Sequence, residues 1–183
     1  MPLGTRDAGR PRRIAGMRGN SGNTSMIAVG WVLLLGVMFW FFVDWNEREA
    51  NPNRNLTATA SAEVVLQRSR NGHYYADGEI NGRRVKFLLD TGATQIAFSR
   101  TLANDLGLKL GPPITLQTAA GPATGYPTRL ASVRLGAIEI TDLGAVVSEG
   151  MGEDSVLLGM NFLRRLEMVQ RGEQMTLRPL AGK

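Results

Sequence analysis

The acidic residue Asp90 directly follows the apolar run Phe87-Leu88-Leu89 and is itself followed by Thr91 and Gly92. A carboxylate at the end of a buried apolar strand must be partnered or give up its charge, because an isolated buried charge is costly. Two carboxylates that share one proton meet this condition. One member of such a pair can activate water while the other donates a proton. We therefore interpret Asp90 as half of a two-carboxylate active site.

Other catalytic chemistries have little support in the composition. The 183-residue chain contains no cysteine, which excludes disulfides, thiolate metal sites and cysteine nucleophiles. Its single histidine, His73, argues against a multi-histidine metal centre and leaves little basis for a serine–histidine triad. We expect His73 to be a surface loop residue, and we expect neither a metal nor any other cofactor. Carboxylates remain as the groups able to perform catalysis.

The net charge of +5 is concentrated at the N-terminus. Residues 1–25 contain five arginines and one aspartate, a net of +4, so the rest of the chain carries only +1. A nucleic-acid-binding domain would carry its basic side chains on a folded face. We therefore expect no nucleic-acid partner and interpret residues 1–25 as a basic tail.

Residues 26–43 form an apolar run without a charged residue. At about 1.5 Å per residue, a helix of this length spans roughly 27 Å, close to the hydrocarbon thickness of a bilayer. Arginines precede the run, whereas Asp44, Glu47 and Glu49 follow it. The positive-inside rule then predicts a single-pass transmembrane helix with the N-terminus in the cytoplasm and the rest of the chain outside.

Two alternatives to a membrane anchor remain open. A buried core helix seldom runs so long without a polar residue. A cleaved signal peptide usually has a shorter apolar region with a small-residue cleavage site close behind it. Here the nearest such pattern, residues 58–62, lies well beyond the apolar run. We therefore favour an uncleaved anchor at residues 26–43.

The elements that position Asp90 belong to the C-terminal part of the chain. Residues 44–66 are predicted to be a linker, and residues 67–183 a folded domain of short strands separated by turn signals. Asn81-Gly82 lies between the strand-like runs 74–80 and 83–89, and Asn-Gly is the strongest short signal for a hairpin. The second strand of this hairpin ends at Asp90.

The rest of the domain is predicted to contain further strands and only two short helices. Ser99 can cap the first helix, and Gly107 can end it. The expected helices are 100–106 and 160–166. The expected strands are 115–119, 124–130, 132–135, 138–141, 143–147, 167–170 and 174–177.

The chain also contains an internal repeat. Leu88-Leu89-Asp90-Thr91-Gly92 is echoed by Val156-Leu157-Leu158-Gly159, and each segment precedes a short helix. With Asp90-Thr91-Gly92-Ala93-Thr94, the polar hairpin around Gly121, and residues 157–163, the sequence resembles the retropepsin-type aspartic proteases. More narrowly, it resembles the membrane-anchored bacterial members of that group. The resemblance covers roughly residues 72–180.

This resemblance implies an all-β fold, a retropepsin-like half-barrel of short antiparallel strands with two short helices. It implies that Asp90 is catalytic and that two chains form a homodimer, because each chain supplies only one such aspartate. Thr91 would bond across the dimer, and Gly92 would let the backbone approach the carboxylates. The residues expected to support the loop are Thr91, Gly92, Ala93 and Thr94.

The resemblance also implies a flap that closes over an extended peptide. The flap and substrate-binding candidates are Ala120, Gly121, Gly125 and Tyr126, with Tyr126 either packing beneath the flap or touching substrate. Leu157, Leu158 and Gly159 would form the corresponding element of the second half, in which Gly159 allows close packing beneath the active-site loop. Met160 and Phe162 are expected to be core residues.

The preferred interpretation is a homodimeric, membrane-anchored aspartic endopeptidase. It would act on peptide or protein substrates at the periplasmic side of a bacterial inner membrane. The alternative is a protease-like module without catalysis that binds peptides or forms a scaffold at the membrane, since one chain carries only half a site. The remaining acids are expected to be turn, helix-surface or loop charges: Asp77, Asp105, Asp142 and Asp154.

Overall fold

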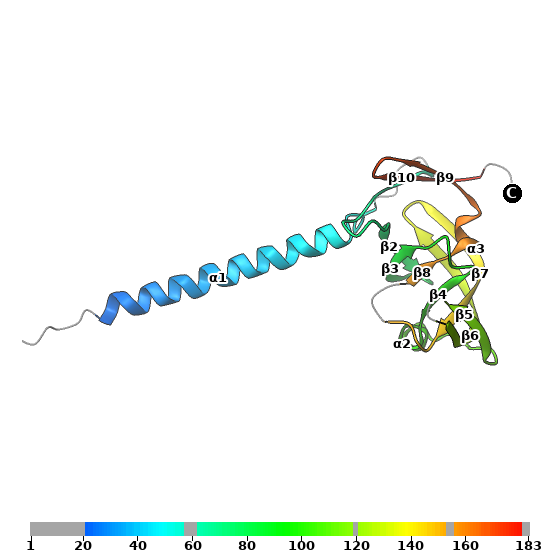
Figure 1. Ribbon diagram of the computed structural model, residues 1–183, viewed down its shortest axis with the longest axis horizontal. Coiled ribbons are helices and arrows are strands. Elements are labelled where there is room, and N and C mark those ends of the chain that lie inside the picture. The colour runs from blue at the N-terminus through cyan, green and yellow to red at the C-terminus, as the bar shows by residue number, and fades with distance from the viewer. Residues whose placement is uncertain (1–20, 57–61, 119–120, 153–155, 181–183) are drawn as a thin grey trace, which may run out of the picture. The chain divides into compact units, whose positions relative to one another are not determined.

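A computed structural model describes residues 21–56, 62–118, 121–152 and 156–180, with side chains omitted at 21–25, 47 and 48. The chain divides into two units, Met1–Phe42 and Val43–Lys183. The helix α1, Ser21–Ala50, begins before and ends after the predicted span 26–43 (Figure 1).

Within α1, Met26–Asn46 is long and apolar enough to cross a membrane, a test that a membrane anchor and a signal sequence both pass. None of this stretch is buried, which contradicts the alternative of a soluble core helix. The helix continues beyond the apolar run because residues 44–50 contain neither glycine nor proline. One turn of this extension is supported by Trp45, whose ring N–H donates to the Glu49 carboxylate at 2.7 Å.

Two buried asparagines follow the helix and join this segment to the domain. The Asn53 side-chain amide donates to the carbonyl oxygens of Gln67 and Tyr75, and its own oxygen accepts from the Gln67 N–H at 2.7 Å. Asn51 donates to the Asp77 carboxylate at 2.6 Å. The prediction that residues 44–66 form a linker is therefore wrong for Asn51 and Asn53, which belong to the domain.

Replacing Asn53 by alanine is expected to destabilise the domain. The substitution removes three hydrogen bonds from a residue that is only 5% exposed, and it leaves backbone groups of the neighbouring strands without partners. A buried unsatisfied group costs about 1–3 kcal/mol, so the thermal midpoint should fall by several degrees. The matched control is Asn55→Ala, because Asn55 is exposed. Equal thermal midpoints for the two variants would contradict this role of Asn53.

Seven strands form the main sheet in the order β2-β3-β8-β4-β7-β6-β5. An additional pairing joins β2 to β6, through Glu79 with Arg134 and Ile80 with Val133, and so closes the sheet on itself as a barrel. The strands are β2 (Tyr75–Ile80), β3 (Arg83–Leu89), β4 (Ile96–Ser99), β5 (Ile114–Thr118), β6 (Gly121–Leu135), β7 (Ile138–Ser148) and β8 (Val156–Leu158).

The domain is mostly β, as expected, but its strands are neither all short nor all antiparallel. The expected strands over 124–135 are one strand, β6, and those over 138–147 are one strand, β7. Two pairings are parallel, β3 with β8 and β4 with β7. Parallel partners are joined by long connections, so local turn signals in the sequence do not indicate them.

The structure confirms the predicted turn and helix cap. Asn81 and Gly82 both have positive φ, 51° and 80°, as a type I′ turn between β2 and β3 requires. Ser99 caps α2 (Arg100–Asp105) by accepting the Leu102 N–H. The second short helix, α3, covers Met160–Leu163 and is shorter than the predicted 160–166.

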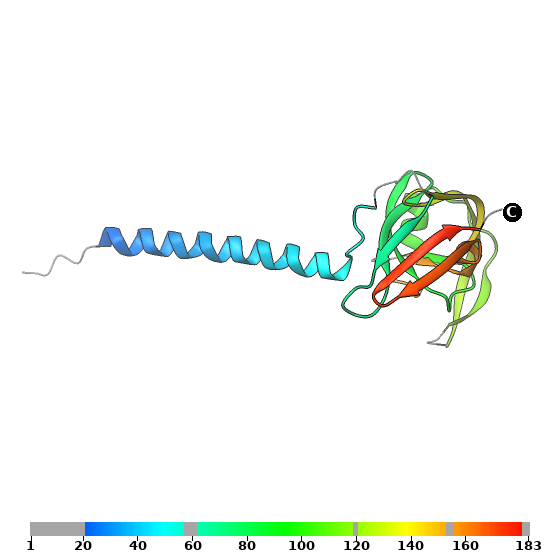
Figure 2. The same ribbon diagram turned by 90° about the horizontal axis from the view of Figure 1, so that it is seen from above.

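A second sheet contains three strands in the order β1-β10-β9. The strands are β1 (Val64–Gln67), β9 (Leu166–Arg171) and β10 (Gln174–Pro179). The β9–β10 hairpin was predicted, whereas residues 64–66 of β1 fall in the predicted linker. Figures 1 and 2 show this hairpin in brown to red against the barrel. The two sheets enclose one core, whose fully buried members include Phe87, Phe98, Phe162, Leu66 and Leu177.

Candidate active site

Asp90 stands at the end of β3, where the two repeated apolar segments of the sequence lie side by side. Leu88 pairs with Leu157, and Leu89 pairs with Leu158, in the parallel pairing of β3 with β8. The Asp90 N–H donates to the Leu158 carbonyl oxygen at 3.2 Å. The internal repeat predicted from the sequence is therefore a pair of neighbouring strands.

The loop after Asp90 is held from both sides. Within the loop, the Gly92 N–H donates to the Asp90 carboxylate oxygen Oδ1 at 2.8 Å, which orients the half-buried carboxylate. From below, the Met160 N–H donates to the Ala93 carbonyl oxygen at 2.8 Å, and the Asn161 N–H donates to the Thr94 carbonyl oxygen at 3.1 Å. The Ala93 N–H also donates to the Asp90 carbonyl oxygen at 3.3 Å, so the backbone from Asp90 to Thr94 is fixed by hydrogen bonds within the loop and to the start of α3.

The outer side of this loop is open. Thr91 and Gly92 are exposed, as is Thr94, whereas Ala93 is half-buried. The Thr91 hydroxyl has no hydrogen-bond partner among the described residues. An exposed loop with a free hydroxyl beside a fixed carboxylate offers a surface on which another chain can dock.

Gly159 lies directly beneath the loop. A Cβ atom at this position would lie 2.6 Å from the carbonyl carbon of Gln95 and 2.8 Å from the carbonyl oxygen of Ala93. Contacts this short to backbone atoms exclude any side chain without a shift of the loop. Gly159 therefore has the close packing that was expected of it, between a buried Leu158 and the loop.

Asn161 is a structural residue of the site that was not among the predicted site residues. Its side-chain oxygen accepts the N–H of the buried Ile96 at 3.1 Å, and its amide donates to the Gly144 carbonyl oxygen at 2.6 Å. Asn161 thereby joins the start of β4 to β7 at the point where the loop ends. Its position two residues after Gly159 was the only signal in the sequence.

The expected flap is the hairpin of β5 and β6. Ile114 pairs with Gly125, and Thr118 pairs with Gly121, so Gly121 and Gly125 lie in strand β6 and not at the tip. Ala120 lies outside the described residues. Strands β2 and β7 pair with this hairpin, and its side chains make polar contacts with Arg100, Glu149 and Lys109. None of these pairings and polar contacts among the described residues reaches the loop 90–94.

Tyr126 lies at the base of this hairpin in a small polar cluster. Its hydroxyl donates to the Glu149 carboxylate at 2.9 Å, and the Arg100 guanidinium lies 4.2 Å from its ring centre. Arg100 and Glu149 also form an ion pair at 3.1 Å. Of the two roles considered for Tyr126, packing at the base of the flap agrees with these contacts.

Two of the acids that were expected to be surface charges form ion pairs. Asp105 pairs with Arg83, and Asp142 pairs with Arg129. The hydrogen bond and charge of Arg129 lower the pKa of Asp142, with a smaller contribution from Arg165.

Phe162 is fully buried and Met160 packs against the core, both as expected. His73 is exposed, with its ring edge against Tyr75. Asp154 lies outside the described residues.

Comparisons with known proteins agree with this geometry. A family model described as "gag-polyprotein putative aspartyl protease" matches residues 76–165, the stretch that contains Asp90 and Gly159. The structure is similar to the crystal structure of a retropepsin-like aspartic protease from Rickettsia conorii, with a TM-score of 0.54 and 32% identity. This match covers 63% of the present chain and 89% of the other.

Two curated relatives also match. The uncharacterized protein in the cobV 5′ region of Sinorhizobium sp is 38% identical over 120 residues, covering 63% of this chain and 52% of the relative. The uncharacterized protein RP867 of Rickettsia prowazekii is 36% identical over 114 residues, covering 60% of this chain and 48% of the relative. The chain thus spans about half the length of the curated relatives it matches. The match to the Rickettsia conorii structure, together with the family model, shows that the chain belongs to the retropepsin-like aspartic proteases.

Proposed function

We propose that this chain is a membrane-anchored aspartic endopeptidase that hydrolyses peptide bonds as a homodimer. The observation that carries the proposal is the position of Asp90, at the end of β3 in a loop fixed from beneath by β8 and α3. The 183-residue sequence contains one Asp-Thr-Gly motif, and we propose that a second chain supplies the second carboxylate.

Two Asp90 carboxyl groups that share one proton supply both functions that hydrolysis needs. The ionised member takes a proton from water while the water oxygen bonds to the peptide carbonyl carbon. The protonated member gives its proton to the carbonyl oxygen, which yields a neutral gem-diol. The C–N bond then breaks as the nitrogen accepts a proton from the protonated aspartic acid, while a hydroxyl of the gem-diol returns its proton to the ionised aspartate. A carboxylic acid and an amine leave, and the pair again holds one proton.

The exposed loop residues support docking of the two chains around Asp90. Thr91 has a free hydroxyl to bond across the twofold axis, and Gly92 leaves room for the partner's carboxylate. In the retroviral enzymes that the sequence resembles, both chain termini build the dimer sheet. Here β1 and β10 already pair within one chain, so we propose that the interface is formed mainly by the Asp90 loops.

The proposed location is a bacterial inner membrane, with residues 1–25 in the cytoplasm and the barrel domain on the periplasmic side. The apolar stretch Met26–Asn46 and the five arginines that precede it support this topology. The bacterial sources of the matching proteins support the type of membrane. Anchoring would favour dimers, because confinement to a membrane raises the effective concentration of partners.

The proposal is tested by digestion of an unfolded protein with the full chain in neutral detergent between pH 3 and pH 7. We expect cleavage, with an initial rate that rises as the square of chain concentration where dimers are scarce, and linearly where they predominate. A rate that stays linear down to concentrations at which the chain sediments as a monomer would contradict the shared site. A chain that binds the substrate without cleaving it at any pH would instead be a peptide-binding module.

A further inference from the structure

A depression of about 350 Å³ lies beside the active-site loop. Its wall includes Thr94 and Gln95 at the end of the loop, Arg129 and Asp142 on β6 and β7, and Arg164 and Arg165 after α3. We call it the three-arginine pocket. No residue of the proposed dyad lies in it, so the mechanism described above leaves this surface unexplained.

The charges in this pocket are unbalanced. Arg129 donates from Nε to the Asp142 carboxylate at 2.8 Å, so these two residues largely neutralise each other. Arg164 and Arg165 are exposed, and neither makes a side-chain hydrogen bond or ion pair to another described residue. The lining therefore has a net charge of +2 from three arginines and one aspartate. The Arg165 charge acts on Asp142 without a hydrogen bond or ion pair, so both guanidinium groups can still bind an external carboxylate.

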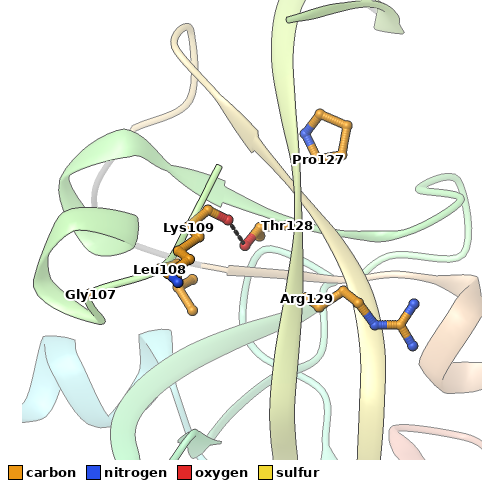
Figure 3. Close-up of a pocket in the computed structure, with 6 residues that line it drawn as sticks. All are labelled: Gly107, Leu108, Lys109, Pro127, Thr128 and Arg129. Carbon is orange, nitrogen blue, oxygen red and sulfur yellow. Dashed lines mark hydrogen bonds between the residues drawn. The ribbon is translucent and has the colours of Figure 1, made fainter. Parts of the chain in front are cut away.

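A second depression, of about 460 Å³, shares Arg129 with the three-arginine pocket. It lies between β6 and the segment Gly107–Lys109, where the Thr128 hydroxyl donates to the Lys109 carbonyl oxygen at 2.9 Å (Figure 3). The Arg129 side chain points away from Leu108 and Lys109 in this view. Lys109 adds a cation to this second depression.

One wall of the pocket is close to Asp90 along the chain. Thr94 follows Asp90 by four residues, so their Cα atoms are at most about 15 Å apart. An extended peptide covers this distance in about five residues. The connection is also rigid, because the Thr94 carbonyl oxygen accepts the Asn161 N–H.

We propose that the three-arginine pocket binds the side-chain carboxylate of an acidic residue in the substrate, within about five residues of the cleaved bond. This inference rests on the proposed peptidase function. A twofold dimer carries two such pockets, one on each side of the catalytic pair. Acidic residues should therefore be favoured both before and after the cleaved bond.

The test measures binding in the full-length Asp90→Asn chain in neutral detergent, so that no cleavage is needed. Fluorescently labelled twelve-residue peptides carry one glutamate, moved position by position, and each has a glutamine counterpart. At the favoured positions we expect glutamate to bind about five- to tenfold more tightly than glutamine. The preference should shrink as salt is raised, since exposed charges are screened.

Charge reversal then tests whether Arg164 and Arg165 cause the preference for glutamate over glutamine. Arg164→Glu with Arg165→Glu should remove the difference between glutamate and glutamine peptides. The matched control, Arg84→Glu with Arg171→Glu, makes the same change of charge at exposed arginines outside the pocket and should retain the difference. Thermal midpoints identify any variant that is misfolded. Arg164→Gln with Arg165→Gln is the milder replacement and should also abolish the preference.

Three results would overturn the inference. Equal binding of the glutamate and glutamine peptides at every position would remove the carboxylate preference. Loss of the preference in the control variant as well would show a general charge effect. Reversal at Arg164 and Arg165 that weakens binding to phosphatidylglycerol vesicles but not to the acidic peptides would identify a lipid site. If the Asp90→Asn chain prefers glutamate peptides but the parent chain cleaves no substrate, the proposed pocket is supported and only the proposed peptidase function is contradicted.

Discussion

Replacing Asp90 by asparagine is expected to lower the rate of peptide hydrolysis on the order of 10³-fold, the range typical of losing general acid–base catalysis. The amide keeps the shape of the side chain and can still accept the Gly92 N–H, so the loop should remain folded. It can neither take a proton from water nor share one with a partner. The measurement is the cleavage rate of one peptide by the two purified chains, with thermal midpoints compared alongside.

The matched control for this substitution is Asp105→Asn. Asp105 is an aspartate on α2 whose side chain is 48% exposed and forms an ion pair with Arg83. Its loss should leave hydrolysis within about twofold of the parent, because exposed ion pairs contribute little. If Asp90→Asn and Asp105→Asn are equally active, Asp90 has no part in the mechanism.

Mixing experiments extend this prediction to the dimer. When equal amounts of parent and Asp90→Asn chains exchange freely, about one quarter of the dimers contain Asp90 in both chains. If both carboxylates are required, activity falls to about one quarter of that of the same total amount of parent chain. If each chain works alone, activity falls only to about one half. The two models are therefore separated without knowledge of the natural substrate.

The sequence predicted those parts of the structure that depend on neighbouring residues. Asn81-Gly82 requires positive φ whatever surrounds it, and Ser99 caps α2 with its own side chain. The apolar runs ending at Asp90 and Gly159 indicated two equivalent strand ends, although not that the strands pair in parallel. These local features were sufficient to locate the candidate site.

The parts that could not be predicted depend on contacts between distant residues. Asn53 lies in a stretch whose composition is typical of a linker, yet it binds Gln67 and Tyr75 from 14 and 22 residues away. The fold places Arg164 and Arg165 in one pocket with Arg129 and Asp142, which are distant in the sequence. Long-range hydrogen bonds and shared pockets leave no periodic pattern in the chain, so only the fold reveals them.

Replacing Gly159 by alanine is expected to damage both stability and activity, because the new Cβ would overlap the backbone of the active-site loop. Its neighbours would be Gln95 and Ala93 backbone atoms at 2.6 and 2.8 Å, which cannot move aside as a flexible side chain would. Overpacking of this kind costs about 1–3 kcal/mol, and a loop displaced by about 1 Å can lower the rate about 10²-fold. Gly144→Ala is the matched control, since its Cβ would meet only the Gln95 side-chain oxygen at 3.5 Å. Urea denaturation and peptide hydrolysis of the two variants measure both effects. If Gly159→Ala matched Gly144→Ala in both assays, β8 would not support the loop as closely as the structure shows.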